Sequence, residues 1–227
     1  MTDNHVLSGV TLTRAGVKAL VDDGRVCTLV ACDLSGADLG RLPLTGWRFS
    51  DCQLGHTLFR EAGLEEAQFT ACRGAFADFT AARLEEAVFE RCDFNNAPFR
   101  RAKMASVSFK TCRLTGADFT DVSAVDLQFI ASLLTCARLV GRSFRKTTLT
   151  DIDFSEADLS RCDFTEAVLQ GCSLRDAVLT GCTFRGADLR GADLGGVQLE
   201  DITRFKGAIL SRGQAADILA AAGVKVI

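Results

Sequence analysis

The residues from Ala77 to Phe94 read ADFTAARLEEAVFERCDF, and a large apolar side chain returns in this stretch at every fifth position. These side chains are Phe79, Leu84, Phe89 and Phe94, and Ala or Cys stands two residues before each of them. An amphipathic helix repeats its apolar residues every three or four positions, and a half-buried strand repeats them every two. A period of five therefore indicates a different kind of regular backbone.

The same register extends from Leu29 to Leu199 without an insertion. The fifth residue, which we call the centre, is Leu or Phe throughout except at Gly74, Met104 and Ala124. The position two before the centre holds Ala, Cys, Ser, Thr or Val, with these exceptions: Leu42, Trp47, Leu127, Arg142 and Ile152. Because a unit of five residues cannot bury its own centre, neighbouring units must stack into a solenoid.

Columns of Phe indicate how many units make one turn of this solenoid. Phe recurs every twenty residues in three series: Phe49, Phe69, Phe89, Phe109 and Phe129; Phe59, Phe79, Phe99 and Phe119; Phe144, Phe164 and Phe184. A coil with four sides of five residues places such side chains above one another, and the backbones of successive coils then pair at about 4.8 Å per coil. We predict an all-β solenoid of about nine coils whose corners are tight turns, where Gly is frequent two residues after the centre.

The pattern resembles the motif of the pentapeptide-repeat family, which is a small residue, Asp or Asn, Leu or Phe, and two polar residues. Matching triplets are Ala37-Asp38-Leu39, Ala77-Asp78-Phe79, Ala117-Asp118-Phe119, Ala157-Asp158-Leu159, Ala187-Asp188-Leu189 and Ala192-Asp193-Leu194. The resemblance covers about three quarters of the chain. It implies a right-handed quadrilateral β-helix. Several members of the family bind DNA gyrase or topoisomerase IV by imitating duplex DNA, and they inhibit the enzyme or protect it from quinolones.

Both ends of such a stack need caps, since an open end exposes unpaired backbone groups. We predict a tail and a short capping helix in residues 1–26, the repeat β-helix in 27–202, and a final partial coil with a second short helix in 203–227. Thr13 is the expected N-cap of the first helix, and Gly24 is its expected stop.

The C-terminal helix is predicted to begin with a capping box formed by Ser211 and Gln214 and to end at Gly223. Covering the last coil is its simplest role. The apolar residues here exceed what one cap needs, which favours a homodimer through this end as an addition to that role. The residues expected at the dimer contact are Ile218, Leu219, Val224, Val226 and Ile227. The resemblance implies the same contact, since the quinolone-resistance members form dimers through their C-terminal ends.

Composition narrows the class of protein. Lys and Arg number 26 against 29 Asp and Glu, and the net charge of −3 gives no electrostatic case for direct binding of nucleic acid. The N-terminus lacks the features of a signal peptide, and no apolar run reaches the length of a membrane span. We therefore expect a cytoplasmic protein without membrane contact, whose ten cysteines are reduced thiols.

The sequence offers no evident catalytic or metal site. All the cysteines except Cys136 occupy the small inward position, where packing as small apolar residues explains them best. Neither His5 nor His56 has an evident nucleophile and orienting carboxylate near it. No phosphate loop, dinucleotide fingerprint or metalloprotease motif is present. We predict that the protein is not an enzyme and that it needs no metal or cofactor.

Two surface features could carry function. One is an acidic side, formed in adjacent coils by Glu61, Glu65, Glu66, Glu85 and Glu86, although a solvated surface with compensating charges would look the same. The other is an apolar patch in the least regular part of the repeat, formed by Val125, Ile130, Leu133 and Val140.

The leading prediction is a non-enzymatic, DNA-mimicking binder of DNA gyrase or topoisomerase IV that uses the acidic side. The alternative is a scaffold or regulatory module that binds another protein through the apolar patch. Two properties weigh against global mimicry. The net charge of the chain is small, whereas about 40 Å of duplex DNA carries roughly two dozen negative charges. The sequence also lacks the loop insertions with which the plasmid-borne quinolone-resistance members engage gyrase.

Overall fold

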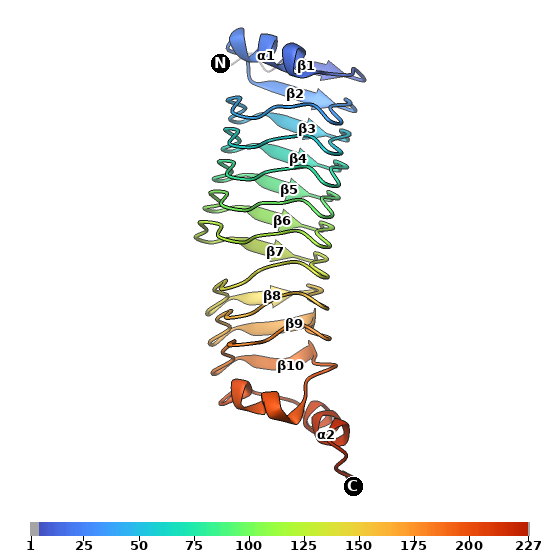
Figure 1. Cartoon of the computed structure of the whole chain (residues 1–227), viewed down its shortest axis with the longest axis vertical. Helices are drawn as coiled ribbons and strands as arrows, with labels where there is room; N and C mark the ends of the chain where they lie inside the picture. Colours follow the sequence, from blue (N-terminus) through green and yellow to red (C-terminus); the bar gives the residue numbers. More distant parts are fainter. Residues whose placement is uncertain (1–4, 227) are drawn as a thin grey trace. The chain divides into compact units, whose positions relative to one another are not determined.

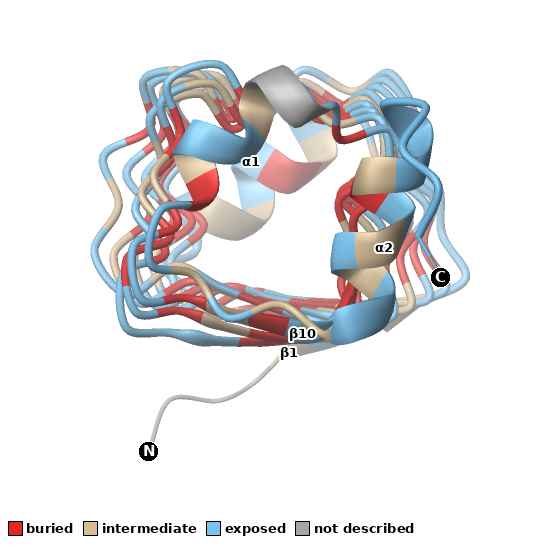
Figure 2. Cartoon of the chain, turned by 90° about the horizontal axis from the view of Figure 1, so that it is seen from below, coloured by how far each residue is buried: buried red, intermediate tan, exposed pale blue. Residues whose placement is uncertain are grey.

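A turn that recurs every five residues bends the chain into four-sided coils. The second residue after nearly every centre has a positive φ, whether or not it is glycine, as at Glu66 (58°), Asn96 (57°) and Gly116 (69°). Nearly all the centres and the small residues two before them are buried on the inside of the coil, whereas most other positions face outward (Figure 2). Phe69 pairs in parallel register with Phe49 on one side and Phe89 on the other, so one coil contains twenty residues.

The computed structural model describes residues 5–226 of the chain. They fall into two compact units, residues 5–132 and 133–226, and each unit is a stack of parallel coils. The predicted β-solenoid of about nine coils with short terminal helices is confirmed. Among the described residues, no helix is both long and apolar enough to cross a membrane.

The first unit contains one parallel sheet of seven strands, which follow one another in chain order along one wall (Figure 1). The strands are β1 (His5–Ser8), β2 (Cys27–Val30), β3 (Arg48–Ser50), β4 (Gln68–Thr70), β5 (Val88–Glu90), β6 (Ser108–Lys110) and β7 (Gln128–Ile130). Single parallel bridges connect the other walls of successive coils, as between Gly63 and Arg83 and between Asp78 and Leu58.

Helix α1 (Arg14–Asp22) begins after Thr13, and Gly24 follows its end with a φ of 69°, as predicted. Val17 on its inner face is fully buried. The side chain of Arg14 donates hydrogen bonds to the backbone oxygens of Asp38 and Gly40, at 2.8 and 3.1 Å. The helix is therefore fixed to the adjoining coil by both apolar and polar contacts.

Stacked Phe rings fill the interior of the first unit. The ring of Phe89 lies 4.7 Å from that of Phe69 and 4.6 Å from that of Phe109, and the planes differ by no more than 15°. The Phe column of the neighbouring wall meets this stack edge to face, with Phe79 and Phe99 at 5.9 and 6.1 Å from Phe89. The prediction that residues twenty apart stack directly is confirmed.

The second unit contains the strands β8 (Thr148–Thr150), β9 (Val168–Ser173) and β10 (Asp188–Asp193), followed by the 3₁₀ helix η1 (Leu199–Phe205) and helix α2 (Arg212–Ala221). The repeat shifts by one residue within η1, because Phe205 rather than residue 204 stacks on Phe184, at 4.8 Å.

The side chain of Gln214 hydrogen-bonds helix α2 to the last coil. The Gln214 amide donates to the backbone oxygens of Leu189 and Ala192, both at 2.7 Å. Its oxygen accepts from the backbone N–H of Ser211 at 2.7 Å, and the Ser211 hydroxyl accepts in return from the Gln214 N–H at 3.2 Å. The predicted capping box is confirmed, and its Gln also supplies the donors that a further coil would have supplied to β10.

The irregular positions keep the backbone of the repeat. Arg142 is half-buried in an inward slot that holds a small residue in most other coils. Its N–H donates to the oxygen of Leu139, and its own oxygen accepts from Asp163, as at regular positions, so the chain does not bulge. Leu127 is half-buried and thus less enclosed than the small residues of other coils.

Candidate interaction surfaces

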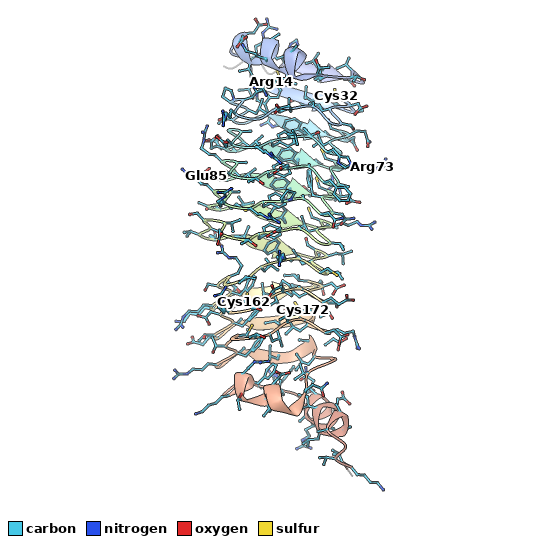
Figure 3. The ribbon with its side chains drawn as sticks, viewed as in Figure 1. Arg14, Cys32, Arg73, Glu85, Cys162 and Cys172 are labelled. Atoms are coloured by element: carbon cyan, nitrogen blue, oxygen red, sulfur yellow. The ribbon has the colours of Figure 1, made fainter. Side chains whose placement is uncertain are left out.

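The predicted acidic side forms at a corner of the first unit. Glu65 and Glu66 make up the turn after one centre, and Glu85 and Glu86 make up the same turn in the next coil. The Glu66 N–H donates to the oxygen of Glu85 at 2.8 Å, so the two turns are in contact. Glu85 lies on the side of the coils opposite to Arg73 (Figure 3). The structure therefore brings these four residues together as expected.

Two of the five predicted carboxylates are neutralised by arginine. Arg41 donates to both oxygens of Glu61, each at 3.1 Å, and these hydrogen bonds lower the pKa of that carboxyl. Glu65 accepts from Arg83 at 2.5 Å and from the Thr45 hydroxyl at 3.0 Å. Burial acts to raise the pKa of Glu65, but these hydrogen bonds outweigh it and the pKa is lowered. Both ion pairs lie on the surface, where solvent screens them.

The remaining three carboxylates differ in their surroundings. Within residues 5–226, Glu66 and Glu86 form no ion pair, and both are exposed at corners with φ values of 58° and 62°. Glu85 is half-buried, and its Oε2 is enclosed without a hydrogen-bond partner. The charge of this side that is both exposed and unpaired is thus concentrated on the column formed by Glu66 and Glu86.

The predicted apolar patch falls on both units and is described in two parts. In the first unit, Val125 is 75% exposed and Ile130 is 41% exposed. In the second unit, Leu133 is 42% exposed and Val140 is half-buried. Val125 is therefore the most exposed large apolar side chain of the four.

The residues predicted at a C-terminal dimer contact have different environments. Ile218 is buried on the inner face of α2, where it covers the last coil, and Leu219 is half-buried. Val224 and Val226 are 46% and 50% exposed. Ile227 lies outside the described residues. The two valines are thus the members of this group that are available for contact.

No constellation typical of catalysis is found among the described residues. His56 stacks against Phe76 at 5.1 Å, and His5 lies 3.4 Å from Arg25. A hollow of about 310 Å³ lies beneath α2, but the described residues that line it include no His, Cys, Ser, Thr or Lys. Across residues 5–226, no three His, Cys, Asp or Glu side chains are placed to share a metal ion.

The cysteines lie as predicted, with Cys136 exposed and the other nine buried. The thiols of the longest column donate to backbone oxygens of the preceding coil, as Cys72 does to Phe49 at 3.3 Å and Cys92 to Phe69 at 3.3 Å. Burial raises the pKa of Cys162 to about 12. Because they are buried and donate to backbone oxygens, the thiols of this column are packing groups with a weak hydrogen bond.

Phe76 is the residue that the sequence analysis missed. It occupies the second position after a centre, where the other residues with positive φ are polar, charged, Gly, Ala or Cys. Its side chain is 50% exposed, whereas the other Phe side chains lie in the interior. The signal was available, because a single large apolar residue stands out in a column of outward positions that twenty-residue alignment puts together.

Comparison with known proteins gives matches to two models of one family. A pentapeptide repeat region matches residues 25–99, and eight copies of the pentapeptide repeat match residues 157–196. No curated protein sequence matches the chain.

Among solved structures, a trypsin-treated variant of QnrB1, a plasmid-mediated fluoroquinolone resistance protein, has a TM-score of 0.75 at 23% identity, over 88% of this chain and 100% of that chain. Full-length QnrB1 has a TM-score of 0.64 at 22% identity, over 87% of this chain and 100% of that chain. At these identities the likeness concerns the fold.

Proposed function

Because the chain belongs to the pentapeptide-repeat family, we propose that it is a non-enzymatic interaction protein that binds DNA gyrase or topoisomerase IV through its acidic side. The fold likeness to QnrB1, which extends over the whole of that chain, supports this choice of partner class. In this proposal the protein modulates the topoisomerase or protects it from quinolones.

The observation that carries the proposal is the column formed by Glu66 and Glu86. Both carboxylates are exposed, lie in adjacent coils and form no ion pair within the described chain. A basic DNA-binding surface on the partner would supply the missing cations. The contact would then be electrostatic, would form quickly and would weaken as salt is added.

The small number of free carboxylates limits the imitation of DNA to a small area. Two coils span about 10 Å along the stack. The same length of duplex carries about six phosphate charges. The column presents two free carboxylates, and Arg41 and Arg83 cancel the charges of Glu61 and Glu65. We therefore propose that the acidic side replaces a few phosphates at one point of the topoisomerase surface.

A charge-reversal pair tests the proposal. Glu66→Lys/Glu86→Lys should weaken binding to purified gyrase or topoisomerase IV at least tenfold, and it should abolish any effect on supercoiling with or without a quinolone. The matched control is Glu156→Lys/Asp176→Lys, which makes a similar charge change at exposed corners of adjacent coils with φ values of 58° and 55°. Equal loss in both variants would show that net charge alone matters. Absence of wild-type binding at micromolar concentration would remove the proposal.

A second candidate function rests on the exposed apolar side chains of the first unit. Val125 and Ile130 lie at outward positions, where most other coils carry charged, polar or small residues. A scaffold that binds another protein would use them as apolar contacts. Ile130→Asp should then abolish a defined complex and leave the circular dichroism spectrum unchanged, whereas the acidic-side variant should leave that complex intact.

We also propose a homodimer through the C-terminal end, supported by the exposure of Val224 and Val226 beyond α2. Light scattering after gel filtration should give twice the chain mass for the wild type and the chain mass for Val224→Asp/Val226→Asp. A wild-type protein that is monomeric at 100 micromolar or so would remove this part of the proposal.

A further inference from the structure

The backbone of the Phe76 corner does not require an aromatic side chain. Its φ is 61°, a left-handed conformation that is rare for bulky residues and that Asn and Gly adopt readily. Asn96 and Gly116 occupy the same column in the next two coils, with φ values of 57° and 69°. The side chain of Phe76 contributes nothing to the interior, and half of it stays in contact with water.

What holds the Phe76 ring is an outward contact. The ring stacks on His56 of the preceding coil, with centroids 5.1 Å apart and planes within 4°. This contact restricts the side-chain torsions, so that less freedom would be lost when a partner covers the ring. An exposed aromatic side chain held in one orientation is typical of the residues that contribute most to the affinity of protein interfaces.

Guanidinium groups lie on both walls that meet at this corner. Arg73 stands three residues before Phe76, is exposed and makes no ion pair with any described residue; Figure 3 shows it pointing away from the coils. On the other wall, Arg60 donates through Nε to Asp78, which stands two residues after Phe76, at 2.5 Å. The Asp78 side chain is 8% exposed and that of Arg60 is 63% exposed, so the positive group covers the negative one.

The same arrangement recurs two coils further on. Arg100 donates through Nε to Asp118 at 2.6 Å, and the Asp118 side chain is 9% exposed. Half-buried Pro98 lies between the two paired carboxylates in the same column of the wall, and half-buried Leu58 lies in the coil before Asp78. No described residue accepts a hydrogen bond from the Nη groups of Arg60 and Arg100. Both guanidinium groups are thus oriented by a buried carboxylate and keep free donors toward the outside.

We propose that the Phe76 corner is a docking site for an acidic protein segment that carries apolar side chains. Its carboxylates accept from Arg60 and Arg73, and its apolar side chains cover the exposed part of Phe76. Charge complementarity selects this occupant, because the outermost charges around the ring are guanidinium groups while the paired carboxylate lies beneath. The residue that follows Arg73 in its column, one coil further on, is Asp93. Its carboxylate is already within 3.9 Å of Arg113.

A nucleic acid fits these observations less well. Single-stranded nucleic acids also stack on aromatic rings, but their affinity depends on a groove of many uncompensated cations. Here Arg60 and Arg100 are already partly compensated by Asp78 and Asp118, and the net charge of the chain is −3. A short segment with a few carboxylates needs only the two or three guanidinium groups that are present.

Selection from a phage-displayed library of random peptides tests the proposal with the immobilised full chain. We expect the selected peptides to combine Asp or Glu with aliphatic or aromatic residues. In fluorescence anisotropy, a synthetic peptide of this kind should bind the wild type at least about tenfold more tightly than it binds Phe76→Asn. Arg73→Ala should also weaken binding, and added salt should reduce the difference between Arg73→Ala and the wild type.

Two controls distinguish a loss of peptide docking from a loss of fold stability and from an effect of the acidic side. Phe76→Asn introduces the residue that the next coil already has in this column, so its melting temperature should equal or exceed that of the wild type. Glu66→Asn makes the corresponding change at a corner with a φ of 58°, and it should leave peptide affinity unchanged. Because no topoisomerase is present in these measurements, their result is independent of the proposed function.

Several outcomes would overturn the proposal. These are failure to enrich acidic and apolar peptides, enrichment of peptides that bind Phe76→Asn equally well, and a clear fall in the melting temperature of Phe76→Asn. Binding of an oligothymidine that depends on Phe76, or a dimer that Phe76→Asn dissociates, would assign the corner to another occupant and would equally refute the acidic segment.

Discussion

Gly74 and Phe94 form a small–large pair inside the first unit, and their interdependence can be predicted in detail. The other centres of this column in the first unit are Leu34, Leu54 and Leu114. A Cβ atom added to Gly74 would lie 2.1 Å from Cε1 and 2.5 Å from Cδ1 of the Phe94 ring. The ring therefore occupies the space that a side chain at Gly74 would fill, and neither residue fits without the other.

The geometry gives the expected free energies. Gly74→Leu alone forces a side chain into the volume of the ring and should lower the free energy of unfolding by about 3 kcal/mol or more. Phe94→Leu alone opens a cavity above Gly74 and loses edge-to-face contacts with Phe69, Phe79 and Phe89 at 5.9, 5.3 and 5.5 Å. That change should cost about 2–3 kcal/mol. The double variant restores a column of leucines and should cost only about 1–2 kcal/mol.

Equilibrium unfolding in urea measures the coupling between the two sites. Trp47 is buried in the first unit and is the single Trp of the chain, so its fluorescence reports on this unit. The double variant should be more stable than the sum of the single effects predicts, by about 2 kcal/mol or more. Gly74→Leu combined with Phe164→Leu of the second unit is the control and should be additive. Additivity within about 0.5 kcal/mol for the adjacent pair would refute the reasoning.

Three further predictions concern pH, the C-terminal cap and the thiols. Burial acts to raise the pKa of Asp78, but hydrogen bonds from Thr80 and Arg60 hold this pKa below the ordinary 3.8. The Asp78 carboxylate therefore stabilises the fold above pH 3.8, and this stabilisation is lost as the pH falls through the lowered pKa. The difference in melting temperature between the wild type and Asp78→Asn should therefore be largest near neutral pH and vanish in strong acid; a constant difference would contradict this. Gln214→Ala leaves two backbone oxygens of β10 without their donors and should cost about 1–3 kcal/mol locally, seen as faster hydrogen exchange in α2, whereas Gln198→Ala should not change that exchange. An aromatic disulfide reagent should react quickly with one thiol of the native protein, Cys136, and with all ten cysteines in denaturant; several fast native thiols would disprove the burial described here.

The twenty-residue columns could be predicted because the interior obeys one rule at nearly every position. A centre must be large and apolar, and the side chain above it must be of a similar kind, so Phe69, Phe89 and Phe109 revealed the coil length without any long-range information. Where two positions compensate each other, the rule fails locally. Gly74 looked like a defect in the repeat, and only the position of the Phe94 ring shows that the interior there is full.

The surface was harder to predict, because its properties depend on which side chains reach one another. Glu61 and Arg41 are twenty residues apart, so this pair could have been found by aligning the coils. The pairs Glu65 with Arg83 and Asp78 with Arg60 connect residues eighteen apart, and the long side chains of arginine bridge different columns. Counting carboxylates along a side therefore overestimated its free charge. The buried state of Ile218 likewise depends on how α2 lies on the last coil, which no periodicity specifies.

The four-sided coil has a consequence for how such a chain can change its length. Inserting or deleting one pentapeptide would leave every later centre facing inward, so the interior would still accept the sequence. It would also rotate all later residues by a quarter turn, moving each outward side chain to the adjoining wall and separating partners such as Arg60 and Asp78. A gain or loss of a whole coil neither rotates the residues beyond it nor moves their outward side chains to another wall. Length variation in steps of twenty residues is therefore compatible with a retained binding face. A step of five residues preserves folding but divides the residues of the binding face between two walls.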